Sequence, residues 1–349
     1  MQKLFNLGNR AVRWFRKENT NAALILLYHR IAELPADPQL LSVSPSHFAE
    51  HLEVLRKYTH PLSLQQLVDA LRSGNLPPRA VVITFDDGYS DNLTHAKPLL
   101  AQADIPATIF ISTGYTEWKQ EFWWDELERI FLQPNTLPQT LSLKVADRLH
   151  ECDLGNVATY HQEEYDRDRS WNVLQATNPT PRHLIYRALH QQLFGLSGAE
   201  IAATLQKLQE KSGQGTIARL THKPMIKEEI VQLAEEGLIE VGAHTMTHPV
   251  LANLPIAAQQ EEIERSKTTL ETILGHSVNS FSYPFGTPQV SYTSQTVELV
   301  REMGFNCAVT TSPELVEGSG DRYQLPRIGI RDCNGDEFAE QLQELLPVA

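Results

Sequence analysis

The stretch AVVITFDDGY, residues 80–89, decides the fold. Its first six residues form a short apolar run, which is typical of a strand covered on both faces in a parallel sheet. Asp86 and Asp87 follow directly. Adjacent carboxylates at the end of a buried strand repel each other, so one of them needs a positive partner. The stretch therefore predicts a buried strand that ends at a cation site, although a plain turn or helix cap also favours Asp and Gly.

Strand and helix patterns alternate on both sides of this stretch. Further runs that we predict to be strands lie at residues 22–28, 107–111, 238–243, 277–283, 307–310 and 323–330. Amphipathic stretches separate them, for example residues 44–58, where Ser44 is a suitable N-cap and Pro45 a suitable first helical residue. The alternation predicts an α/β fold with a parallel sheet, either closed as a barrel or open and doubly wound.

Residues 115–224 interrupt the alternation. They are rich in polar and helix-forming residues, and patterns such as AEIAATLQKLQEK (199–211) predict a mainly helical insertion. We therefore expect a barrel domain over residues 21–349 that the insertion at 115–224 divides. Residues 1–20 form a separate basic segment with the pattern of an amphipathic helix.

Charge and hydropathy exclude some classes of partner and location. The chain has 349 residues and a formal net charge of −13, and phosphates repel so acidic a protein, so no nucleic-acid partner is expected. The apolar run at 22–28 is far shorter than the roughly 18 residues of a membrane span and precedes no signal cleavage site. We expect a cytoplasmic protein. Residues 1–20 suit either peripheral contact with an anionic membrane or packing on the protein's own flank.

Polar side chains follow several of the predicted strands. The carboxyl ends of parallel strands meet at one edge, where ligands and catalytic groups gather. His29 follows the first strand, and His244 and His248 follow the strand at 238–243. If residues 244–248 form a helical turn, both imidazoles can meet one metal, and a carboxylate from Asp86 or Asp87 completes a three-ligand set with open positions. The other aspartate then serves as a general base.

The motifs TFDDGY, HTMTHP and YPFG, in this order, resemble those of the polysaccharide deacetylase family, whose catalytic region is the NodB-homology domain. LLYHRI near the start, SPSHFAEHLEVL after it and LPRI near the end extend the resemblance across both sides of the insertion. It implies a distorted (β/α) TIM-like barrel of about seven strands. It also implies a hydrolase that removes N-acetyl or O-acetyl groups from an amino sugar or glycan with a divalent metal, usually Zn²⁺; Co²⁺, Ni²⁺ and Fe²⁺ also suit such ligands.

The resemblance assigns roles to individual residues. Asp87, His244 and His248 would be the metal ligands, and Asp86 the general base. In the YPFG motif, the backbone N–H of Phe285 would stabilise the oxyanion, with Tyr283 and Pro284 beside the substrate. A plain Pro-Gly turn is the simpler interpretation of that motif.

The chain departs from the family pattern at two points. Tyr283 stands where the family commonly has an arginine that holds the base, and no histidine follows His276 to protonate the leaving amine. Arg327, in the LPRI motif, is our candidate partner of Asp86, with a structural surface charge as the alternative. His29 is our candidate general acid or substrate-orienting group, with a hydrogen bond across the barrel mouth as the alternative.

Four of the five tryptophans lie in the insertion. We predict that Trp123 and Trp124 contact a sugar ring, because aromatic faces stack on sugars, although their helical spacing equally favours packing. Two other functions compete with sugar deacetylation. One is a catalytically impaired sugar-binding protein on the same fold, which the missing late histidine favours. The other is a phosphoesterase or amidohydrolase, whose sites often hold two metals.

Overall fold

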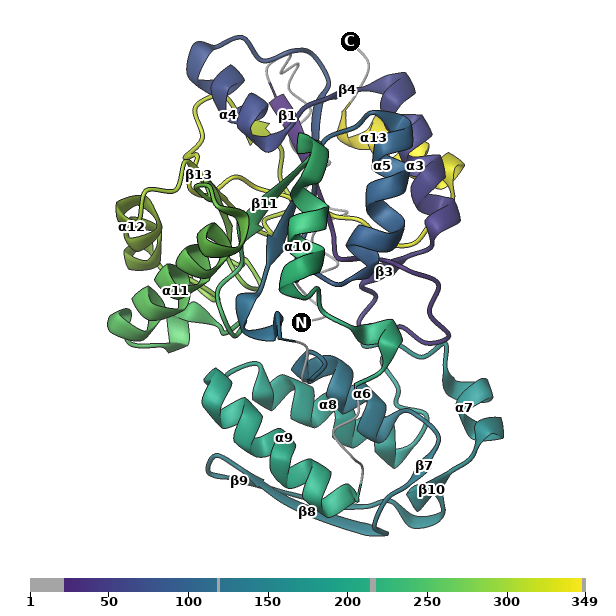
Figure 1. Ribbon diagram of the computed structural model, residues 1–349. Helices are drawn as coiled ribbons and strands as arrows, with labels where there is room; N and C mark the ends of the chain where they lie inside the picture. The colour runs from purple at the N-terminus through teal and green to yellow at the C-terminus, as the bar shows by residue number, and fades with distance from the viewer. Residues whose placement is uncertain (1–21, 118–119, 214–217, 347–349) are drawn as a thin grey trace.

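The computed structural model describes residues 22–117, 120–213 and 218–346. A curled sheet forms its centre, and its main strands run parallel (Figure 1). In spatial order these strands are β13 (Cys307–Val309), β12 (Ser280–Ser282), β11 (Ile239–Ala243), β6 (Ala107–Ile111), β5 (Ala80–Phe85) and β1 (Ala22–Tyr28). All six strands were expected from the sequence, and the predicted bounds of β1, β5 and β6 agree with the structure to the residue.

A late segment connects the two outer strands of this sheet. Leu325 forms a parallel bridge with Val309 of β13, and β15 (Ile328–Gly329) pairs in parallel with Leu26 and Leu27 of β1. β14 (Val316–Glu317) pairs antiparallel with the start of β1, whereas β4 (His60–Pro61) pairs in parallel with the start of β5. The predicted strand at 323–330 is therefore confirmed in part, and it brings the LPRI motif to the mouth of the curled sheet. The predicted α/β class with a distorted, barrel-like sheet is confirmed.

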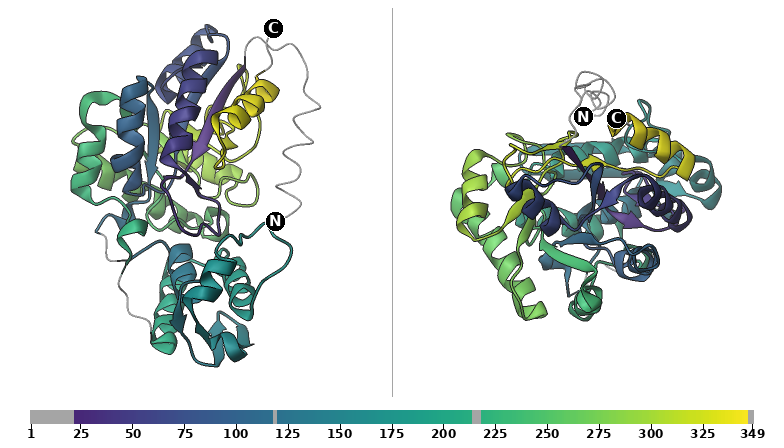
Figure 2. Two further views of the ribbon diagram at one scale, coloured as in Figure 1. Left: turned by 90° about the vertical axis from the view of Figure 1, so that its right-hand side faces the viewer. Right: turned by 90° about the horizontal axis from the view of Figure 1, so that it is seen from above.

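Helices cover the outer face of the sheet, and neighbouring helices pack on one another around it (Figure 2). They are α3 (Pro45–Tyr58), α5 (Lys97–Ala103), α10 (Lys227–Ala234), α11 (Ile256–Leu274), α12 (Ser294–Glu302) and α13 (Gly335–Leu345). Alternation along β1 shows why the strand is wholly apolar: Leu24 and Leu26 pack towards these helices, whereas Ala23 and Ile25 join an inner cluster. A further helix, α4 (Leu64–Ser73), adds apolar side chains to that inner cluster.

Local signals start and stop the helices as expected. Ser44 accepts a hydrogen bond from the amide of His47 at the start of α3. Ser63 and Gln66 form a reciprocal capping box on α4, and Gly74 ends that helix with φ of 71°. Glycine adopts this left-handed conformation at the least cost, so Gly74 is suited to end the helix, and the capping box is suited to start it.

The insertion forms a lobe below the carboxyl edge of the sheet (Figure 1). Its helices are α6 (Trp123–Phe131), α7 (Gln162–Asp168), α8 (Pro181–Leu193) and α9 (Gly198–Ser212), and its own apolar core lies between them. It also contains a hairpin, β8 (Thr140–Val145) with β9 (Arg148–Asp153), and a short pair, β7 (Asn135–Thr136) with β10 (Thr159–Tyr160).

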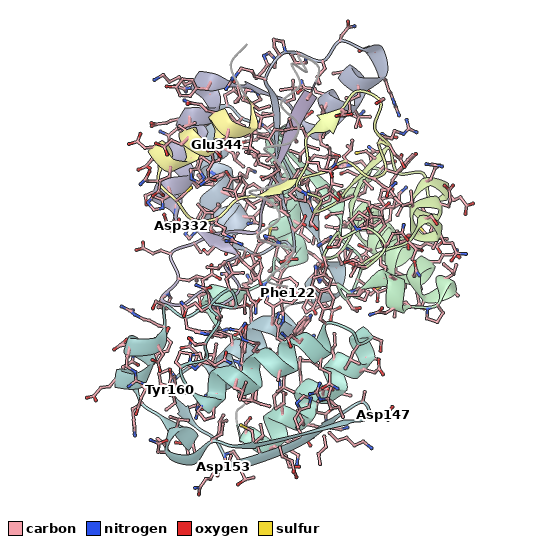
Figure 3. All side chains as sticks on the ribbon, turned by 180° about the vertical axis from the view of Figure 1, so that it is seen from behind. Phe122, Asp147, Asp153, Tyr160, Asp332 and Glu344 are labelled. Atoms are coloured by element: carbon pink, nitrogen blue, oxygen red, sulfur yellow. The ribbon has the colours of Figure 1, made fainter. Side chains whose placement is uncertain are left out.

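The hairpin adds strands to the segment that we predicted to be mainly helical. Leu141, Leu143 and Val145 of β8 are buried and alternate with more exposed residues, so a period of two was present in the sequence. Asp147 and Asp153 mark the hairpin at the far end of the lobe, whereas Phe122 lies near the barrel (Figure 3). Residues 1–20, for which we predicted a basic amphipathic helix, lie outside the described residues. In the described part of the chain, no helix has the length and apolar character to cross a membrane.

Candidate active site and metal centre

The acid pair lies where β5 ends, at the mouth of the sheet. The amide of Asp86 continues the ladder by donating to the carbonyl oxygen of Tyr28, and the chain then turns through Asp87 and Gly88, with φ of 73° and 84°. A Cβ at Gly88 would lie 3.1 Å from Cγ1 of Ile111, so this turn also needs a small residue. Backbone strain of this kind concentrates at functional sites, and here it points two neighbouring carboxylates in different directions.

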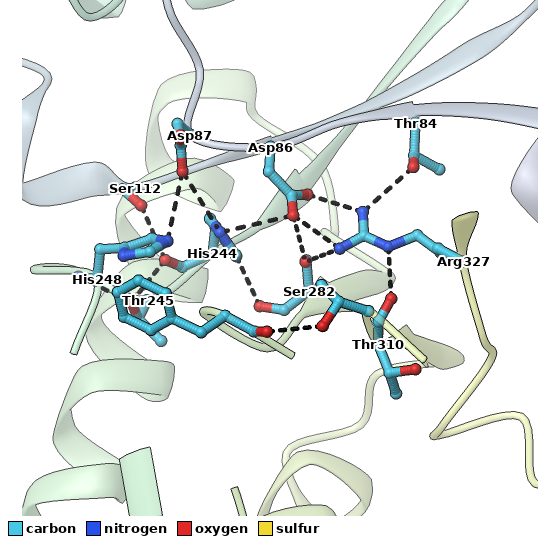
Figure 4. A network of polar contacts seen from close by, with 12 residues as sticks. Thr84, Asp86, Asp87, Ser112, His244, Thr245, His248, Ser282, Thr310 and Arg327 are labelled. Carbon is cyan, nitrogen blue, oxygen red and sulfur yellow. Dashed lines mark hydrogen bonds and ion pairs between the residues drawn. The ribbon is translucent and has the colours of Figure 1, made fainter. Parts of the chain in front are cut away.

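Arg327 holds Asp86 through two hydrogen bonds (Figure 4). Its Nη1 lies 2.8 Å from Oδ1 and its Nη2 2.7 Å from Oδ2, and the arginine side chain is fully buried. Ser282 and Thr84 accept further hydrogen bonds from the same guanidinium, and the carbonyl oxygen of Thr310 accepts one from Nε. The contact that we expected between Arg327 and Asp86 is therefore present, and the alternative of a surface charge is wrong.

This ion pair decides the ionisation of Asp86. Burial by itself would raise the pKa of the carboxyl, but Arg327 and then His244 outweigh it and hold the pKa well below its ordinary value. Asp86 is therefore an anion whose orientation is fixed by two hydrogen bonds from Arg327.

Asp87, His244 and His248 form a second cluster beside this pair. One ligand atom from each lies within 4.8 Å of the others, and all three residues are buried. Nε2 of His248 lies 3.4 Å from Oδ1 of Asp87, and Nε2 of His244 lies 3.7 Å from it. Nδ1 of His244 donates to the carbonyl oxygen of Ser282 at 2.7 Å, so its Nε2 carries the lone pair that a metal needs.

The donor set fits a divalent cation. Oδ1 of Asp87 and Nε2 of His244 are buried and have no hydrogen-bond partner, which is costly unless a cation meets them. Burial, and after it the carboxylates of Asp86 and Asp125, raises the pKa of Asp87 well above its ordinary value, so its anion lacks a positive neighbour of its own. Burial lowers the pKa of both histidines, which keeps them neutral and able to ligate. Asp87, His244 and His248 are therefore suited to bind a metal with two nitrogens and one oxygen.

The loop between the two histidines is not the helical turn that we expected. Thr245 and His248 have φ of 62° and 57°, and the segment follows β11 as an irregular bend. Oε2 of Glu262, from α11, accepts the amides of Met246 and Thr247, both at 2.9 Å, and its Oε1 accepts the hydroxyl of Thr247 at 2.7 Å. The imidazoles come together because this carboxylate holds the bend, and no feature of the HTMTH motif predicted Glu262.

We expect Glu262→Gln to weaken metal binding about 10-fold to 100-fold, because a partner that orients a ligand loop typically has an effect of this size. Glutamine can accept at only one oxygen and so loses part of the three-bond clamp. Titration of metal-depleted protein measures the effect. Glu261→Gln, on the exposed neighbouring position of α11, is the matched control, and equal affinities in both variants would contradict the role.

His29 and Phe285 lie near these groups. His29 is half-buried, and burial lowers its pKa to about 4. The charge of Asp86 raises this pKa, whereas Arg327 and His244 lower it further. Its imidazole is thus uncharged at neutral pH. The ring of Phe285 packs edge-on against His248 at 4.6 Å, and its backbone has φ of 60°. The roles predicted for His29 and for the amide of Phe285 stay predictions.

The side chain of Tyr283 points away from the site. Its ring stacks on Tyr292 at 4.0 Å, its hydroxyl donates to the carbonyl oxygen of Tyr323, and it is fully buried. Our expectation that this side chain contacts substrate is therefore wrong, because Tyr283 follows directly after β12, on the opposite side from Ser282, and packs into the apolar core. Pro284 is buried at the turn before Phe285.

The two tryptophans are buried in the core of the insertion, and this corrects the expectation of an open sugar platform. Trp123 is 2% exposed and Trp124 is 5% exposed. Trp124 packs edge-on against His248 at 5.1 Å, and its Nε1 donates to the hydroxyl of Tyr89. That hydroxyl donates to Asp125 at 2.7 Å. Trp124, from the insertion, therefore packs against His248, one of the candidate metal ligands. Tyr89 belongs to the DDGY motif and links Trp124 to Asp125, a contact that the sequence did not predict.

Comparison with known proteins adds to this geometry. The model of the family described as polysaccharide deacetylase matches residues 73–187 and 195–308, which is more than half of the chain. Poly-beta-1,6-N-acetyl-D-glucosamine N-deacetylase of Escherichia coli (strain K12) is 36% identical over 89 residues, covering 25% of this chain and 13% of that protein. The protein of that name from Staphylococcus aureus (strain MSSA476) is 31% identical over 112 residues, 28% of this chain and 39% of that protein. These matches span less than half of each relative's length.

Solved structures share the fold. IcaB from Ammonifex degensii aligns with a TM-score of 0.55 and 19% identity over 93% of this chain and 97% of that chain. The Streptococcus pyogenes deacetylase PplD, solved in complex with acetate, aligns with a TM-score of 0.53 and 18% identity over 94% of this chain and 99% of that chain. At this level of identity, the likeness concerns the fold.

Proposed function

This chain belongs to the polysaccharide deacetylase family, and we propose that it is a metal-dependent hydrolase that removes N-acetyl groups from a glycan. The observation that carries the proposal is the convergence of Asp87, His244 and His248 beside a buried, ionised Asp86. Two relatives are named for N-deacetylation of poly-beta-1,6-N-acetyl-D-glucosamine, so we take this polymer as the first substrate to test.

A divalent cation bound by Asp87, His244 and His248 would polarise the acetyl carbonyl and make the attacking water more acidic. Asp86 would accept a proton from that water, since its carboxylate is ionised and lies 3.9 Å from Nε2 of His244. Arg327 would keep the carboxylate in its orientation while the proton moves. The backbone N–H of Phe285 would donate to the oxyanion of the tetrahedral intermediate.

His29 is our proposed proton donor to the leaving amine. Its low pKa leaves it neutral before the reaction, so it would have to receive the proton from Asp86 or the solvent and then deliver it. This assignment fills the place of the late histidine that the chain lacks.

The test is acetate release from a β-1,6-linked N-acetylglucosamine oligomer, with metal content measured on the same sample. We expect one bound metal per chain, activity that a chelator abolishes, and recovery when Zn²⁺, Co²⁺, Ni²⁺ or Fe²⁺ is returned. Metal binding without acetate release from any acetylated sugar would instead support the sugar-binding alternative, and cleavage of a phosphate ester would support the phosphoesterase.

A further inference from the structure

A cavity of about 460 Å³ lies between the insertion and the loop that carries His248. Its volume is within the range of small-molecule sites, roughly 300–1,000 Å³. Trp123 and Tyr115 are buried in its wall, whereas Gln120, Ala202 and Gln206 are exposed on its rim. None of the residues discussed as metal ligands or base lines it, so it is a separate space.

The cavity lies against the loop that carries His248, one of the candidate metal ligands. Thr247, the residue before His248, lines it, and so does Gly198, the first residue of α9. A Cβ at Gly198 would lie 2.6 Å from Oγ1 of Thr247, so the helix and the histidine loop are in direct contact. A ligand in the cavity would therefore lie next to the loop that positions His248.

The polar groups of the wall suit a neutral, hydroxyl-rich ligand. Gln209 donates to Oε2 of the buried Glu126 at 2.7 Å, and Arg219 neutralises the buried Glu121 at 2.7 Å. None of the described lining residues is Lys or Arg, so the described part of the wall offers phosphate or sulfate groups no positive partner. Carboxylates accept hydrogen bonds from sugar hydroxyls, and side-chain amides both accept from them and donate to them.

The rest of the wall is largely apolar. Ile201 and Leu205 of α9 give it apolar surface. A pyranose ring presents both an apolar face and hydroxyl oxygens, which matches a wall that combines apolar side chains with carboxylates and amides.

We propose that this cavity binds a sugar residue of the glycan away from the acetyl group that is removed. The proposal rests on the proposed function for the identity of the ligand. The insertion would then be a second carbohydrate-binding element. This favours polymeric over monomeric substrates, because one glycan molecule can then contact both the cavity and the candidate metal centre.

The test uses surface plasmon resonance with the full metal-loaded chain immobilised and a β-1,6-linked N-acetylglucosamine pentamer in the flow, so that turnover does not deplete the ligand. Ala202→Trp fills the rim of the cavity from an exposed position of α9. We expect it to weaken pentamer binding at least 10-fold. Ala203→Trp, on the next exposed position but outside the cavity lining, is the matched control and should bind as the unmodified chain does.

A second variant keeps the proposal testable if Ala202→Trp does not fold. Gln206→Leu removes an exposed polar group from the rim, and the loss of one hydrogen bond should weaken binding about 5-fold. Unchanged binding in the folded cavity variants, an equal loss in Ala203→Trp, or no binding of the pentamer by the unmodified chain would overturn the proposal. If the expected pattern holds but acetate is never released, the proposed function fails and the sugar site stands.

Discussion

Asp86→Asn is expected to lower kcat for acetate release by about 10²-fold to 10⁴-fold while the chain still binds its metal, because the general base is lost and the ligands are not. Asparagine is close to aspartate in shape and still presents one oxygen to Arg327. Turnover and metal content, measured on the same sample, give the two readouts.

Asp87→Asn changes the other acid of the pair, and we expect it to lose metal affinity, whereas Asp86→Asn keeps it. Its metal affinity should fall strongly, since the anionic ligand is removed from a three-ligand set. Because burial and the neighbouring carboxylates destabilise the Asp87 anion, the metal-free Asp87→Asn protein should be no less stable to heat than the metal-free unmodified chain. Equal metal loss in both variants would contradict the division of roles between the two acids.

The local sequence was sufficient to predict the main strands, and the meeting of strand ends at one edge suggested the partner of Asp86. Buried parallel strands are continuously apolar, so their positions depend little on the rest of the chain. Arg327 is 241 residues from Asp86 in sequence, but it lies near a strand end, and the ends of parallel strands meet at one edge. The pairing of Asp86 with Arg327 was therefore predicted from the order of the parallel strands and not from local sequence.

Other features depend on tertiary contacts that no local pattern encodes. The bend at 244–248 has left-handed residues because Glu262 holds its amides, and that glutamate belongs to a helix whose exposed face looks ordinary in sequence. Tyr283 was expected at the site because of its place in a motif, whereas the alternation that places Ser282 at the site turns the next side chain towards the outer helices. The two tryptophans illustrate the same limit, since stacking on a sugar and packing on a core need the same residue types.

Arg327→Met should destabilise the fold by about 3–5 kcal/mol, because it leaves the buried carboxylate of Asp86 without its partner. Denaturant unfolding of the metal-free protein measures this loss. Arg56→Met, at an exposed position of α3, is the matched control and should change the free energy of unfolding by about 0.5 kcal/mol or less. Arg327→Lys keeps the charge but not the pair of hydrogen bonds to Asp86. We therefore expect it to lower the free energy of unfolding by less than Arg327→Met does.

A double variant separates the ion pair from the simple loss of arginine packing. Asp86→Asn with Arg327→Met removes both charges, so the double variant should be more stable than Arg327→Met alone, with a coupling of about 0.5–3 kcal/mol. If the two changes were additive, Arg327 would act by filling space and not by neutralising Asp86. Turnover should be lost in Arg327→Met as well, because Asp86 loses the contact that orients it, and activity equal to that of the unmodified chain would show that another group holds the base.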